Sequence, residues 1–178
     1  MKDQVKTLVV LFTISTILTL NTFTATAQFQ ERTIPSVTIK TLDGKKFDTN
    51  SISNNGRPIL IVVWETTCKS SLTELDALAE NYEDLQKETG VKIIAISIDN
   101  SRTANQVSLV VDSREWKFET YSDINQDFKR AIGFSYCPFN LLLDNTGNIV
   151  WQKSSFAPGD EKVIYELIRK LANGEKIN

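Results

Sequence analysis

Two cysteines, Cys68 and Cys137, are the residues of this sequence best suited to chemistry. Cys68 opens a C-x-x-S sequence that ends at Ser71 and follows an apolar run over residues 58–64. A thiol that follows a strand at the start of a helix ionises more readily, because the helix N-terminus favours the thiolate. Cys137 precedes Pro138, and a peptide bond before proline is the kind that can be cis. The central question is whether these two sulfur atoms meet.

The composition excludes several other kinds of site. The sequence contains no histidine, so it cannot form a His-ligated zinc or copper site, or pair a histidine with a catalytic cysteine or serine. Two cysteines in an exported chain predict a disulfide before they predict a metal site, and we expect neither a metal nor another cofactor. The formal net charge is −2 and there is no long basic run, which argues against nucleic acid as a partner.

A signal peptide is predicted over residues 1–27. Two lysines near the start precede a largely apolar stretch at residues 7–20, and residues 25–27, Ala-Thr-Ala, form a small-x-small cleavage site. We therefore expect a mature domain over residues 28–178 that is periplasmic or otherwise exported. The apolar stretch is short for a membrane span, which needs about 20 residues, so association with the membrane requires an uncleaved signal.

The rest of the chain predicts an α/β domain. Residues 59–64 and 91–98 are apolar runs rich in β-branched side chains, which is typical of strands covered on both faces. Between them, apolar residues recur at three- and four-residue steps from Lys69 to Thr89, and Gly90 ends this predicted helix. Two strands joined by a helix of this length favour a layered α/β architecture.

Smaller elements flank this unit. Residues 36–48 alternate polar and apolar side chains around a turn, which predicts an edge hairpin. A second hairpin is expected over residues 139–153, again around a tight turn. Three further helices are expected: one after Ser101, one over residues 125–132 and one from Asp160. The whole order predicts a mixed sheet with helices on both faces.

The order of elements and several short motifs resemble the thioredoxin fold, and in particular the exported TlpA/ResA-like group of thiol–disulfide oxidoreductases. The motifs are Trp64 four residues before Cys68, Glu74 six residues after it, Gly-Phe-Ser-Tyr-Cys-Pro at 133–138 and an Asp-x-x-Gly-x-Ile-Val turn from Asp144. The resemblance spans essentially all of the domain. It implies a thioredoxin-like three-layer α/β/α fold with a mixed central sheet, an N-terminal β-hairpin and a cis-proline.

The active-site motif departs from the pattern of that group. The second redox cysteine is replaced by Ser71, and the usual proline inside the motif is Ser70. Lys69 directly follows Cys68 and is the charged residue within the motif. The residue before the cis-proline, usually small or β-branched, is Cys137. Reduction by two cysteines on one helical turn is therefore not available to this chain.

The resemblance implies that Cys137 lies against Cys68, because the residue before the cis-proline faces the start of the first helix in that fold. The two thiols could then form a disulfide, either as part of a reaction or as a structural link. From the residues alone, Cys137 can equally be a small buried hydrophobic residue, as free cysteines often are. Cys68 can likewise be an inert thiol, although its position at a helix start favours a reactive one.

The remaining candidate residues surround the two sulfurs. The resemblance implies that Glu74 is a partly buried acid that handles protons, but it can also be an ordinary solvated glutamate. Ser71 lies on the same side of the helix, three residues earlier, and either stabilises a thiolate or simply starts the helix. Trp64, Tyr136 and Pro138 are expected to contact a bound peptide, although core packing is the plainer interpretation of Trp64.

The leading functional prediction is an exported thiol–disulfide oxidoreductase that acts through Cys68, with Cys137 as the resolving thiol and protein thiols or disulfides in the periplasm as partners. One alternative keeps the fold without turnover, as a binding module for cysteine-containing or extended peptides. A thiol peroxidase is the third interpretation. It ranks last because Glu65 stands where the peroxidases that this motif resembles have a threonine.

Overall fold

The computed structural model describes residues 32–177. The predicted signal peptide lies outside these residues. The described residues contain a seven-stranded mixed sheet with the strand order β2-β1-β5-β4-β3-β6-β7. Its strands are β1 Thr38–Thr41, β2 Lys46–Asp48, β3 Ile59–Trp64, β4 Lys92–Ser97, β5 Glu119–Ser122, β6 Phe139–Leu143 and β7 Ile149–Ser154. The predicted N-terminal hairpin is present as the antiparallel pair β1–β2.

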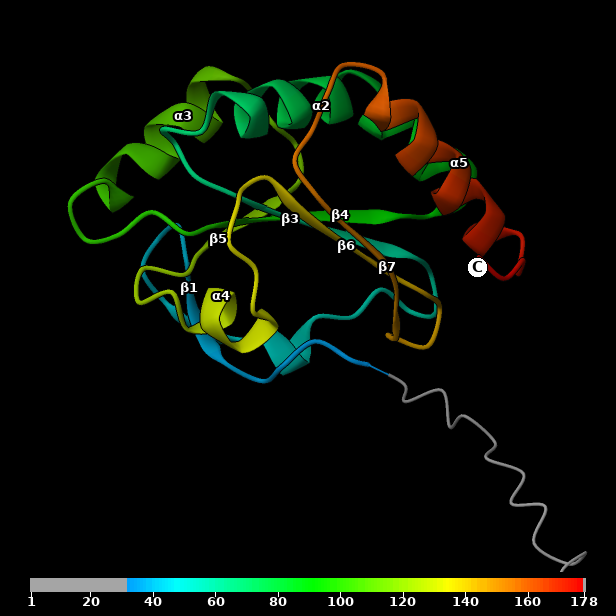
Figure 1. The fold of residues 1–178 in the computed structure, drawn as a ribbon, viewed down its shortest axis with the longest axis horizontal. Coiled ribbons are helices and arrows are strands. Elements are labelled where there is room, and N and C mark those ends of the chain that lie inside the picture. The colour runs from blue at the N-terminus through cyan, green and yellow to red at the C-terminus, as the bar shows by residue number, and fades with distance from the viewer. Residues whose placement is uncertain (1–31, 178) are drawn as a thin grey trace, which may run out of the picture. The chain divides into compact units, whose positions relative to one another are not determined.

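Helices cover both faces of the sheet, as Figure 1 shows. The α-helices are α2 Lys69–Thr89, α3 Val107–Ser113, α4 Asp127–Ile132 and α5 Asp160–Ala172. Residues of α2, α3 and α5 share one apolar core with one face of the sheet. Residues of α4 share a second core with the opposite face. The predicted three layers are therefore confirmed.

The strand β3 lies in the interior of the sheet, between β4 and β6. It pairs in parallel with β4 and antiparallel with β6. Every residue of β3 is buried, because both of its faces carry apolar side chains and both are covered by helices. A short loop, residues 65–67, joins this strand to the cysteine at the start of α2.

The helix α2 has the bounds that the leucine spacing predicts. It ends at Gly90, whose φ of 69° lies in the left-handed region that glycine adopts without strain. The helix predicted over residues 125–132 is shorter in the structure, because Gln126 also has a left-handed φ, 58°, and α4 begins only at Asp127. Local turn geometry therefore sets the start of α4, which the apolar pattern placed too early.

The strand β5 is absent from the sequence-based prediction. It runs parallel to β4 and antiparallel to β1, and so joins the N-terminal hairpin to the rest of the sheet. Its four residues progress from an exposed glutamate to a buried serine. A segment this short and this polar shows neither a continuous apolar run nor a clear alternation. Only its pairing with β4 and β1 in the folded protein identifies this segment as a strand.

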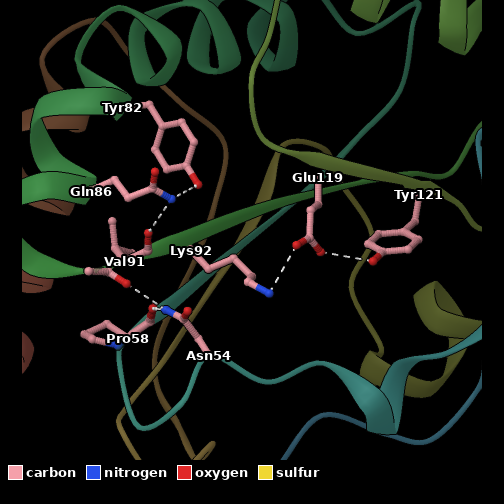
Figure 2. Close-up of polar contacts among 9 residues, drawn as sticks. Asn54, Pro58, Tyr82, Gln86, Val91, Lys92, Glu119 and Tyr121 are labelled. Atoms are coloured by element: carbon pink, nitrogen blue, oxygen red, sulfur yellow. Dashed lines mark hydrogen bonds and ion pairs between the residues drawn. The ribbon is translucent and has the colours of Figure 1, made fainter.

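The end of α2 is tied to the starts of β3 and β4 by side-chain amides, which Figure 2 shows. The Asn54 amide Nδ2 donates to the carbonyl oxygens of Pro58, at 3.0 Å, and Gly90, at 2.8 Å. The Gln86 amide donates to the carbonyl oxygen of Val91, just before β4, at 3.4 Å. The bond from the Asn54 side chain to Gly90 joins residues 36 positions apart in the sequence, and it links the end of α2 to the start of β3.

Among residues 32–177, none of the helices combines the length and the apolar character needed to cross a membrane.

The substitution Asn54→Ala tests whether the Asn54 hydrogen bonds to Pro58 and Gly90 stabilise the fold. It removes the donor of two partly buried carbonyl oxygens, so we expect the free energy of unfolding to fall by about 1–3 kcal/mol. Equilibrium unfolding in urea measures the change. The matched control is Asn50→Ala at an exposed asparagine, which should leave the midpoint nearly unchanged. Equal effects of the two substitutions would contradict this account of Asn54.

Candidate active site

The loop between β3 and α2 is fixed by a buried carboxylate. The backbone amide of Thr66 donates to Asp99 Oδ2 at 2.9 Å, and its hydroxyl donates to Oδ1 at 2.5 Å. Ser97 donates a further bond to the same carboxylate at 2.7 Å. Asp99 is fully buried at the carboxyl end of β4, so it orients the loop two residues before the first cysteine.

Cys68 occupies the N-cap position of α2 and is partly exposed. Its Sγ donates to the backbone carbonyl of Cys137 at 3.3 Å and lies 3.4 Å from the Ser70 hydroxyl oxygen. Burial on its own would raise the pKa of the Cys68 thiol. The nearby polar groups of Cys137 and Ser70, and the hydroxyl and backbone amide of Ser71, outweigh that effect and lower the pKa below its ordinary value. Cys68 is therefore the better nucleophile of the two thiols.

Cys137 belongs to the segment that leads into β6, and its peptide bond to Pro138 is cis. Burial, and then the neighbouring Cys68 sulfur, raise the pKa of the Cys137 thiol to about 12. Both cysteines are free thiols. The structure thus brings together two residues that are 69 positions apart in the sequence. It lowers the pKa of one thiol, Cys68, and raises the pKa of the other, Cys137.

Ser71 stands where a second cysteine of the motif would be, and it is fully buried. Among the described residues, its Oγ has no partner at hydrogen-bonding distance. The hydroxyl is nevertheless near enough to Cys68 and Cys137 to lower the pKa of each thiol. Ser71 therefore lies beside the two sulfurs, and its support of a Cys68 thiolate stays a prediction.

Glu74 is fully buried one turn further along α2. Its Oε1 accepts a hydrogen bond of 2.8 Å from the Asn140 amide on β6. Burial raises the pKa of the Glu74 carboxyl to about 8, and the charges of Asp160 and Cys68 contribute to the rise. The solvated interpretation of Glu74 is therefore wrong, and an acid that changes protonation near neutral pH lies behind the cysteines.

The expected peptide-contacting residues divide into two groups. Tyr136 is 76% exposed beside Cys137, so its ring is available to a partner, and Pro138 next to it is buried. Trp64 is fully buried, and its ring packs edge-on against Trp116 at 5.2 Å between centroids. The expectation that Trp64 contacts substrate is therefore wrong, because the last residue of a covered strand faces the core. The Lys69 side chain is exposed.

Sequence reasoning missed two polar residues of the site. Asn140 is an amide within the otherwise apolar strand β6, and Asp99 directly follows the apolar run that forms β4. A polar residue inside or just after a buried strand is a signal that could have found both. Within residues 32–177, three or more cysteine and carboxylate side chains nowhere come together as a group that could hold a metal ion.

Comparisons with known proteins identify a family and a fold. Residues 31–152 match the model of the AhpC/TSA family. No curated protein sequence matched the chain. Among solved structures, an uncharacterized thioredoxin-like protein from Porphyromonas gingivalis is 38% identical, with a TM-score of 0.71 over 79% of this chain and 92% of that one.

More distant structures share the fold. The thioredoxin domain of a thiol–disulfide oxidoreductase from Bacteroides vulgatus is 20% identical, with a TM-score of 0.63 over 80% of this chain and 97% of that one. StoA from Bacillus subtilis is 18% identical, with a TM-score of 0.58 over 75% of this chain and 97% of that one. The predicted thioredoxin-like fold is confirmed.

The unequal acidities of the two thiols predict selective labelling. Near neutral pH, iodoacetamide should modify Cys68 well before Cys137, because the thiolate is the reacting form. Peptide mass spectrometry after timed labelling measures both rates. Ser70→Ala removes one bond to the Cys68 sulfur and should slow its labelling roughly two- to tenfold. Thr73→Ala, at an exposed position one turn along, is the control and should change the rate little.

Burial of Glu74 predicts a stability that falls as the pH rises. The folded-state pKa of about 8 lies above the ordinary value of 4.5. Between these values the folded protein keeps a proton that the unfolded chain has lost, so the free energy of unfolding should decline by roughly 5 kcal/mol. Below pH 4.5 Glu74 should not make the free energy of unfolding depend on pH, and above about pH 8 the decline should level off. Urea unfolding at several pH values measures this.

The matched variants for that measurement lie on the same helix. Glu74→Gln removes the titrating group, so its unfolding free energy should decline less between these pH values than that of the unmodified protein. Glu80→Gln changes an exposed glutamate and should keep the full decline. If Glu74→Gln and Glu80→Gln show the same dependence on pH, Glu74 is ionised like a surface residue.

Proposed function

The chain belongs to the AhpC/TSA family, and from this membership and the two adjoining cysteines we propose that it is a thiol–disulfide oxidoreductase acting through Cys68. The observation that carries the proposal is the contact between the Cys68 sulfur and residue Cys137, at a helix start that favours the thiolate. We assign it more narrowly to the exported TlpA/ResA-like group, with a variant active site in which the second thiol comes from another segment.

The first step uses the more acidic thiol. The Cys68 thiolate attacks one sulfur of a substrate disulfide, forms a mixed disulfide with it and displaces the other sulfur as a thiolate. That leaving thiolate takes up a proton. Ser70 and Ser71 support this step, because their hydroxyls lower the pKa of the attacking thiol.

Cys137 completes the exchange. Its thiol loses a proton and attacks the Cys68 sulfur, which releases the second substrate sulfur as a thiolate. The substrate gains two electrons and two protons, and the protein retains a disulfide between Cys68 and Cys137. A dithiol protein must then reduce that disulfide for the next cycle. The same steps in reverse oxidise a dithiol substrate, so the direction depends on the partner.

The proton on Cys137 explains the need for a nearby acid–base group. With a pKa of about 12, this thiol is almost entirely protonated at neutral pH and must lose its proton in order to attack. Glu74 has a pKa of about 8 and senses the charge of Cys68. A group of that pKa exchanges protons efficiently near neutral pH. We therefore assign Glu74 the role of proton donor and acceptor behind the two sulfurs.

The partners follow from this chemistry. They are protein thiols and disulfides, which dock beside the exposed Tyr136 ring and the backbone next to Pro138 as an added strand. The signal pattern in the first 27 residues supports an exported, periplasmic location, where disulfides persist. Cleavage of that signal leaves residues 28–178 as the mature domain.

Trapping the mixed disulfide tests the proposal. Cys137→Ser keeps the nucleophile but removes the resolving thiol, so incubation with insulin should leave a protein–insulin adduct on Cys68. Mass spectrometry under non-reducing conditions detects this adduct. The unmodified protein should instead end with a Cys68–Cys137 disulfide, and Cys68→Ser should give neither product. Ser71→Cys, which places a second thiol on the same helical turn, is the positive control for resolution.

Other results support other functions. If Cys137→Ser and the unmodified protein accumulate the same adduct, Cys137 does not resolve it. If Cys68 forms no adduct with any disulfide, the domain is a binding module for cysteine-containing or extended peptides. Consumption of hydrogen peroxide by Cys68 without exchange on insulin supports a thiol peroxidase.

A further inference from the structure

Asn140 is a buried amide that joins the strand β6 to the acid of α2. It is fully buried, and its Nδ2 donates to Glu74 Oε1 at 2.8 Å. Its neighbours along the strand are all apolar. A leucine at this position would serve apolar packing at least as well as the amide does. A buried polar side chain in such a strand requires a partner, and its partner is the acid.

Two buried oxygens without hydrogen-bond partners, one on Glu74 and one on Asn140, show why an amide suits this position. Glu74 Oε2 and Asn140 Oδ1 are both buried, and neither has a hydrogen-bond partner among the described residues. Both atoms are acceptors while Glu74 is ionised. Protonation turns a carboxyl oxygen into a donor, which the amide oxygen can accept. An amide carries a donor and an acceptor together, so it can serve a carboxyl group in either protonation state.

We propose that Asn140 is a positioning residue that holds Glu74 in place through both of its protonation states, so that the acid can give and take a proton inside the protein. This inference rests on the proposed thiol–disulfide exchange, in which Glu74 handles the protons. Asn140 itself does not touch the substrate. It acts by keeping the carboxyl beneath the start of α2 while the charge on that carboxyl changes.

The charges around Glu74 set the background for this role. Asp160, at the start of α5, raises the pKa of Glu74, and Lys153 on β7 lowers it. These two residues form an ion pair of 2.6 Å, so their effects partly cancel. The Cys68 sulfur raises the same pKa from the start of α2. Asn140, from β6, is the uncharged partner that contacts the carboxyl directly.

The substitution Asn140→Leu tests the proposal. It keeps the size of the side chain but removes the donor to Glu74. A hydrogen bond to a charged group is stronger than one to a neutral group, so the ionised acid loses more and the pKa of Glu74 should rise by about one unit or more. Nuclear magnetic resonance of the labelled side-chain carboxyl, followed through a pH titration, measures this shift. The pH profile of exchange with insulin should move in the same direction.

Leu142→Ala is the matched control. Leu142 lies two positions along β6, is fully buried in the core that contains α2, and does not contact the carboxyl through a polar group. Its truncation destabilises the protein through lost packing, but it should leave the titration of Glu74 in place. A purely structural role of Asn140 predicts that the two variants shift the titration equally, and that result would overturn the proposal. An unchanged titration in Asn140→Leu would overturn it as well.

A second measurement needs no change at Asn140. In the unmodified protein, the side-chain amide resonances of Asn140 should move with the pKa of Glu74. In Glu74→Gln they should show no such inflection. Amide resonances that ignore the titration of Glu74 contradict the proposal, even if Asn140→Leu does not fold. Neither titration requires substrate, so these results decide the role of Asn140 separately from the insulin adduct that decides the exchange reaction.

Discussion

The docking of α2 onto β3 and β6 is the constraint on which the site depends. Leu75 and Leu78 are fully buried against the sheet, and a helix presents every third or fourth residue on the same side. Ser71 and Glu74 lie on that side one turn earlier and are therefore carried into the interior with the leucines. The same apolar packing that fixes the helix thus places a hydroxyl and an acid on the buried side of its first two turns.

Much of this arrangement could be predicted from the sequence, for identifiable reasons. The strand β3 and the helix α2 have continuous or strictly periodic apolar residues, which depend on local pattern alone. The short strand β5 was missed, because its neighbours in the sheet define it. The bond from Asn140 to Glu74 was also missed, because it joins residues 66 positions apart. For Trp64 the sequence left both substrate contact and core packing open, since a pattern does not distinguish the rim of a site from the core below it.

The meeting of the two cysteines was expected from the family resemblance rather than from spacing. In the usual arrangement both thiols belong to one helical turn, so local geometry sets their separation. Here the second thiol belongs to the segment before β6, and its position depends on how that segment packs against α2. The fold supplies different surroundings as a result: a hydrogen-bonded helix start for Cys68 and a more buried place for Cys137.

The bond from the Cys68 thiol to the Cys137 carbonyl links the ionisation of the sulfur to the availability of that carbonyl oxygen as a hydrogen-bond acceptor. While Cys68 keeps its proton, one of the two lone pairs of that carbonyl oxygen already has a donor. Once the proton leaves, the sulfur has no hydrogen to donate, so the carbonyl becomes free at the moment the sulfur becomes nucleophilic. A single ionisation therefore activates the attacking sulfur and frees an acceptor beside it, at the place where we propose that a peptide pairs with the protein.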